Sequence, residues 1–133
     1  MRVRGFTLLE VLVTCVIVGV LAAIALPSYL KQVQKSRRSD AQSALVGAAG
    51  QMERYFTERG TYATATLGSG GVYPSTSQNG YYTLSLANLT ATSYTLKAAP
   101  AGAQVGDPCG TMTYTDQGVK GVTGASLPVT ECW

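Results

Sequence analysis

The sequence predicts an α+β fold in which one long N-terminal helix packs on an antiparallel sheet of three or four strands. Three observations support this prediction. Residues 6–26 form an apolar run, and apolar residues then recur at helical spacing as far as residue 56. Beyond residue 60, short segments rich in Thr and Tyr alternate in polarity and are separated by turn residues.

The first half of the predicted helix is apolar on all sides. At about 1.5 Å per residue, residues 6–26 would extend over roughly 31 Å, which matches the hydrocarbon core of a bilayer. Pro27 follows this run. Because proline lacks a backbone N–H, we expect a kink there.

Glu10 is the only charged residue in the apolar run. A charge in the hydrocarbon layer costs several kcal/mol unless it is shallow or paired, so its default interpretation is functional. Arg2 and Arg4 precede the run, and Gly5 separates them from it. If a peptidase cleaved after Gly5, the new amine of Phe6 could pair with Glu10 of a staggered neighbouring chain. Such a buried pair would mainly fix the register of stacked helices.

Two simpler explanations of the N-terminus remain open. A secretory signal peptide would account for the basic start and for the Ala-Ile-Ala sequence at residues 23–25. However, its apolar region is usually about 7–15 residues long and has no internal carboxylate. A plain membrane anchor would explain the length of the run but would give Glu10 no role.

A basic group follows the apolar run and outnumbers the two arginines before it, so the positive-inside rule does not support a cytoplasmic N-terminus. We expect this group to face solvent or lipid headgroups. The alternative is pairing with acidic residues of a neighbouring subunit. The group consists of Lys31, Lys35, Arg37 and Arg38.

The second half of the predicted helix is amphipathic and extends to about Arg59, where Gly60 is a suitable C′ residue. A capping box at residues 39–42 offers an alternative in which the helix breaks into two. The apolar positions are Val33, Ala41, Ala44, Leu45, Ala48, Met52, Tyr55 and Phe56.

Residues 60–79 are rich in Gly, Ser and Thr and predict a surface loop. Residues 80–122 then contain strand-like segments at 81–86, 94–98 and 111–115. We expect these strands to form a sheet with one face packed on the amphipathic half of the helix.

The cysteines favour an exported protein. A bridge between Cys109 and Cys132 would close a loop of about 24 residues and contribute roughly 3 kcal/mol in the chain-entropy model. Disulfides indicate an oxidising compartment. Cys15 lies within the apolar run, where we expect it to act as a small apolar residue.

The chain contains no histidine, so it lacks the residue needed for a Ser-His or Cys-His dyad. The two distant cysteines lack the spacing of a zinc module. We therefore expect no enzyme activity, no metal and no cofactor. Without Arg2 and Arg4, the net charge of +3 falls to +1, and few cations follow residue 60, which gives little electrostatic footprint for DNA. The only basic residues there are Lys97 and Lys120, which could still form a local patch.

The segment Gly5-Phe6-Thr7-Leu8-Leu9-Glu10, followed by an apolar helix and Pro27, resembles the class III signal of type IV pilins and pseudopilins. The resemblance implies cleavage after Gly5 by a prepilin peptidase, N-methylation of Phe6 and an assembly salt bridge made by Glu10.

The C-terminal half adds a second resemblance, to the PilE-type pilins of Gram-negative bacteria. In that family a similar cysteine pair bounds a C-terminal disulfide loop, which implies a bridge between Cys109 and Cys132. The residues that carry this resemblance lie at 51–56, 109–121 and 131–133.

The resemblance implies a pilin fold with a leader at 1–5, a transmembrane assembly helix at 6–27 and a periplasmic head at 28–133, with its disulfide loop at 109–132. It implies a structural subunit, held in the inner membrane before it enters an extracellular filament that supports adhesion or twitching motility. Its partners would be copies of itself, other pilins, the peptidase and the assembly machinery. The alternatives are a DNA-uptake competence pilin and a type II secretion pseudopilin.

Overall fold

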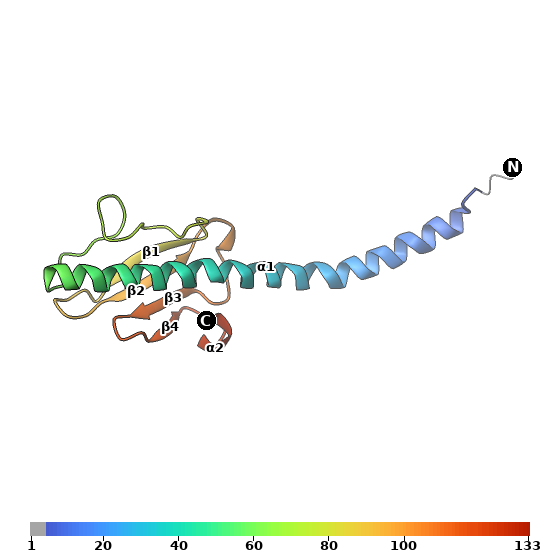
Figure 1. The fold of residues 1–133 in the computed structure, drawn as a ribbon. Coiled ribbons are helices and arrows are strands. Elements are labelled where there is room, and N and C mark those ends of the chain that lie inside the picture. Colours follow the sequence, from blue (N-terminus) through green and yellow to red (C-terminus); the bar gives the residue numbers. More distant parts are fainter. Residues whose placement is uncertain (1–4) are drawn as a thin grey trace. The chain divides into compact units, whose positions relative to one another are not determined.

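The structure is a computed structural model, and it describes residues 5–133. The chain forms two compact units, one ending at Val33 and one comprising Gln34–Trp133, and each is described by itself. The helix α1 (Leu8–Arg59) contributes to both units (Figure 1). Arg2 and Arg4 lie outside the described residues.

In the first unit, α1 exposes its apolar side chains all around its circumference. Within residues 5–133, α1 is the one helix that is long and apolar enough to cross a membrane. It remains helical on both sides of Pro27. The kink expected at that residue stays a prediction.

In the second unit, α1 has one buried face, as its spacing of apolar residues predicts. The helix continues through Ser39, so the alternative of two helices is wrong. The neighbouring Asp40 carboxylate instead accepts hydrogen bonds from the backbone and side chain of Asn79, each at 3.2 Å. α1 ends at Arg59, where Gly60 adopts a φ of 71° and donates its N–H to Phe56 O at 2.7 Å.

Four strands form an antiparallel sheet in the order β1-β2-β3-β4, which is also their order in the chain. Leu84, Ala98, Met112 and Val122 lie side by side across all four strands. The first three strands lie within two residues of the predicted segments, and the fourth strand is the shortest. The strands are β1 (Tyr82–Ala87), β2 (Thr95–Pro100), β3 (Thr111–Thr115) and β4 (Lys120–Thr123).

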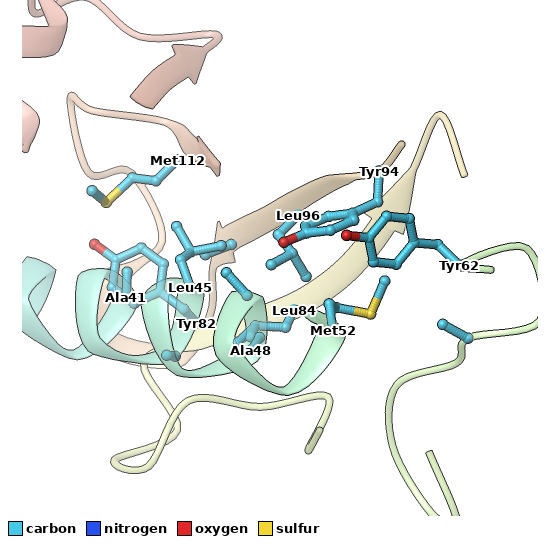
Figure 2. Close-up of a cluster of buried hydrophobic side chains, with 14 residues drawn as sticks. Ala41, Leu45, Ala48, Met52, Tyr62, Tyr82, Leu84, Tyr94, Leu96 and Met112 are labelled. Carbon is cyan, nitrogen blue, oxygen red and sulfur yellow. The ribbon is translucent and has the colours of Figure 1, made fainter. Parts of the chain in front are cut away.

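The core lies between the buried face of α1 and one face of the sheet (Figure 2). Leu45 and Met52 of α1 meet Leu96 and Met112 of the sheet, and all four are fully buried. Small alanines on α1, such as Ala48, are fully buried in the same core. This packing confirms the predicted α+β arrangement.

Two short helices in the second unit were not predicted, η1 (Gly102–Gln104) and α2 (Val129–Cys132). Helices of three and four residues are too short to produce a periodic pattern in the sequence. Cys132 at the end of α2 forms the expected disulfide with Cys109.

Candidate functional site

The candidate site is the N-terminal segment with its single carboxylate. Residues 5–7 are not helical, and Thr7 caps the start of α1. The backbone N–H of Glu10 points to Thr7, 3.2 Å from its hydroxyl oxygen and 3.1 Å from its carbonyl. Thr7 and Glu10 thus have the spacing of a capping box, a signal in the sequence that was missed.

The site is open around the expected cleavage point. A Cβ atom added at Gly5 would meet nothing within 4 Å, so the described fold does not itself demand glycine there. Phe6 is 82% exposed, and the apolar residues that follow are exposed too. Within residues 5–133, the Glu10 carboxylate makes no hydrogen bond or ion pair. An exposed apolar helix with one acid near its start is suited to binding other apolar helices.

The expectation for the basic group is wrong for Arg38, which is neither solvated nor turned towards headgroups. Arg38 is only 6% exposed and pairs with Asp107 of the same chain, with 2.7 Å between Nη2 and Oδ1. The two residues are 69 positions apart, and neither lies in a motif. Sequence reasoning therefore had no signal for this pair. Lys31 and Lys35 are exposed, as expected.

Arg37 is also bound within its own chain. Its guanidinium lies 4.6 Å from the centre of the Tyr81 ring and donates a hydrogen bond of 3.2 Å to Ala103 O. Such a contact over an aromatic face is favourable for a cation. The basic group thus divides into two lysines that face outward and two arginines that hold the head together.

Asp107 is the centre of a buried polar network. Its carboxylate accepts hydrogen bonds from Arg38, the Tyr82 hydroxyl at 2.8 Å, the Gln104 amide at 3.0 Å and the Cys109 N–H at 3.2 Å. Burial by itself raises the pKa of Asp107, but these hydrogen bonds outweigh it and the pKa is lowered. Burial and the bond to Asp107 raise the pKa of Tyr82. The network thus keeps a charged carboxylate inside the head.

A second carboxylate ties the far end of α1 to the sheet. Glu53 accepts hydrogen bonds from the hydroxyls of Tyr62 at 2.9 Å and Tyr94 at 3.0 Å. Burial and the bond to Glu53 raise the pKa of Tyr62 to about 12. Tyr62 therefore keeps its proton, and can donate this bond, at alkaline pH as well as at neutral pH.

Lys97 and Lys120 do not form one patch. In the sheet register, Thr113 lies between Lys97 and Gly121. Lys120 directly precedes Gly121, so alternation along β4 places the two lysines on opposite faces of the sheet. Among residues 5–133, no three potential metal-ligating side chains come together either.

The chain matches family models over both its N-terminal segment and its head. A family model described as prokaryotic N-terminal methylation motif matches residues 1–26. A second family model, described as type IV minor pilin ComP, DNA uptake sequence receptor, matches residues 27–113. The first match contains the candidate site, and the second covers most of the head.

Individual relatives agree with these matches. The chain is 36% identical over 67 residues to fimbrial protein EcpC of Eikenella corrodens, covering 50% of this chain and 44% of that protein. It is 39% identical over 67 residues to type II secretion system core protein G of Klebsiella pneumoniae, covering 50% of this chain and 48% of that protein. The chain thus aligns with less than half the length of these relatives.

A solved structure agrees with the fold. The minor pilin PilV of Neisseria meningitidis superposes with a TM-score of 0.58 at 27% identity, covering 74% of this chain and 96% of that one. The long helix, the four-stranded sheet and the Cys109–Cys132 bridge all match the architecture of solved type IV pilins. Since the second family model also covers more than half of the chain, the chain belongs to the type IV pilin family.

Proposed function

We propose that this chain is a structural subunit of a type IV pilus filament. The observation that supports this most strongly is Glu10, the lone acid in an exposed apolar helix that begins next to Gly5 and Phe6. A prepilin peptidase cleaves after Gly5, and the new N-terminal residue Phe6 is methylated on its amine. Within the filament, the Phe6 amine of one subunit then pairs with Glu10 of a neighbour.

The proposed pathway assigns a place to each part of the chain. Before assembly, residues 6–27 lie in the inner membrane and the head lies in the periplasm, where the disulfide forms. The assembly machinery moves the subunit into a bundle of helices, in which apolar surface that faced lipid faces other subunits. The partners are other copies of this chain and other pilins, and the finished filament supports adhesion or twitching motility.

The test of this function is the composition of surface fibres. Fibres sheared from cells that express the chain would be purified, imaged by electron microscopy and analysed by mass spectrometry. We expect the chain in these fibres with Phe6 as its methylated first residue. A large share of the fibre mass would mark a major pilin, and a trace would mark a minor one. Fibres that lack the chain, from cells that produce it, would contradict the proposal.

DNA uptake is the second candidate, because the family model for residues 27–113 is described as a DNA uptake sequence receptor. On the sheet, the head's two lysines form no joint basic patch, because they lie on opposite faces, and two arginines of α1 are engaged internally. The other cations of the head are exposed along α1, at Lys31, Lys35, Arg54 and Arg59, where phosphate contacts would have to form. The discriminating measurement is a titration of the full chain in detergent micelles with duplex DNA at low and moderate salt. Tight, salt-sensitive binding would favour the DNA role.

A type II secretion pseudopilin is the third candidate, and the relative from Klebsiella pneumoniae supports it. The Cys109–Cys132 loop fits that class less well. Deletion of the chain separates the two assignments, because loss of surface pili with normal secretion of exoproteins indicates a pilin. The opposite result indicates a pseudopilin.

A further inference from the structure

Two side chains of α1 contact both ends of the segment that the disulfide closes. Arg38 binds the Asp107 carboxylate near one end, and its Nη1 lies 3.4 Å from Glu131 O near the other. Gln42 donates from Nε2 to Cys132 O at 3.1 Å. Arg38 and Gln42 are four residues apart and therefore lie on the same face of the helix.

The contacts reach the cysteines directly. On one side, the Asp107 carboxylate that binds Arg38 also accepts the N–H of Cys109 at 3.2 Å. On the other side, Gln42 binds the carbonyl of Cys132 itself. Both cysteine-bearing segments are thus attached to a single rigid helix by bonds that do not involve sulfur.

We propose that Arg38 and Gln42 are positioning residues for the formation of the Cys109–Cys132 disulfide. In the dithiol form they hold both segments against α1, so that the thiols meet without a random search by a loop of 24 residues. Fixing two reactants in place raises their effective concentration, which favours the bond. The coupling is reciprocal, because the closed disulfide strengthens the same contacts by the same factor.

The reaction used to measure this coupling is exchange with glutathione. Two protein thiols and one oxidised glutathione give the protein disulfide and two reduced glutathione molecules. Two electrons and two protons pass from the cysteines to glutathione. The equilibrium constant of this reaction equals the effective concentration of one thiol near the other.

The experiment uses the full chain in detergent micelles with Cys15→Ala, so that only Cys109 and Cys132 exchange. The chain is equilibrated with mixtures of reduced and oxidised glutathione, and its free thiols are then alkylated. Mass spectrometry gives the fractions of the dithiol and disulfide forms. We expect Arg38→Gln to lower the equilibrium constant about ten- to a hundredfold, as loss of charge-assisted hydrogen bonds implies. Gln42→Ala should lower it by about three- to tenfold, since a neutral hydrogen bond contributes less.

Arg54→Gln is the matched control, because Arg54 pairs with the exposed Glu58 on the same helix, at 3.3 Å, away from the disulfide segment. It should leave the equilibrium constant unchanged. A residue that only stabilises the fold would lower the free energy of unfolding of both redox forms equally and would not move this constant. If Arg38→Gln prevents folding, the milder Gln42→Ala decides. Wild-type equilibrium constants in folded Gln42→Ala would overturn the proposal.

Discussion

Glu10 is the third residue of α1, and its backbone N–H is already bound by the capping Thr7. A glutamate at this position can stabilise its own helix by completing a capping box, or it can form an ion pair with an amine of a neighbouring chain. Glutamine can complete a capping box as well but carries no charge. Substitution by glutamine therefore separates the two roles.

We predict that Glu10→Gln and Glu10→Ala both remain substrates for cleavage but fail to enter filaments. The physical reason is that both leave the neighbouring Phe6 amine without a counter-charge in an apolar bundle. Immunoblots of sheared fibres and of membranes give the incorporated and retained fractions. Normal filaments from Glu10→Gln would show that capping, and not charge, is what the residue supplies.

The cleavage point yields a second prediction, because the fold leaves the space around Gly5 open. We expect Gly5→Ala to be processed slowly and Gly5→Trp to remain uncleaved. Since an added Cβ atom meets nothing within 4 Å in the described fold, a loss with Gly5→Ala reports the fit to the peptidase. The fraction of chains that begin at Phe6, measured by mass spectrometry, tests this. Efficient processing of Gly5→Trp would rule out a prepilin-peptidase site.

At the level of elements, the sequence predicted those whose pattern is long. The spacing of alanines with Leu45 and Met52 located the buried face of α1, and alternation located β1, β2 and β3. Short elements such as α2 left no such trace. The ion pair between Arg38 and Asp107 was also missed, because its partners are distant in the chain and are united only by the fold. Local patterns predict helices and strands, whereas polar contacts between distant residues depend on the complete fold.

Two adjacent residues of α1 test its buried face. Leu45 is fully buried, whereas Val46 is 51% exposed. We predict that Leu45→Ala lowers the free energy of unfolding by about 2–5 kcal/mol, because it leaves a cavity between helix and sheet. Val46→Ala should change it by less than about 1 kcal/mol. Urea unfolding of both variants in micelles, followed by circular dichroism, gives the comparison. Equal losses would mean that the helix face is misplaced.

At the level of the whole molecule, the two units separate assembly from stability. The first exposes apolar surface and one acid, and the second has a hydrophobic core, a disulfide and a buried ion pair. Subunits can thus exchange lipid for neighbouring helices while the head stays folded. We expect the free energy of unfolding of the head to depend on pH through Asp107, which pairs with Arg38.

Because the pKa of Asp107 is lowered in the folded head, its contribution to stability is present above the unfolded value of about 3.9. It is lost as the pH falls through the folded pKa. We predict that Asp107→Asn lowers the free energy of unfolding at neutral pH by about 3–5 kcal/mol, since Arg38 is left without its counter-charge. The free energy of unfolding of this variant should also fall less steeply as the pH is lowered.

Urea unfolding at a series of pH values tests this, with Glu58→Gln at an exposed ion pair as the control. The control should retain both the neutral stability and the acid dependence. An Asp107→Asn head with the wild-type acid slope would assign that slope to other carboxylates.

Trp133 bears on how such chains behave when crowded. Its indole N–H donates to Gly121 O on β4, at 3.0 Å. β4 is the last strand of the sheet, and Trp133 directly follows the disulfide-bonded Cys132, so this bond holds the edge strand against the closed C-terminal loop. An edge strand held in its own sheet is less available to pair with a strand of another head, which leaves the helices as the route to ordered polymerisation.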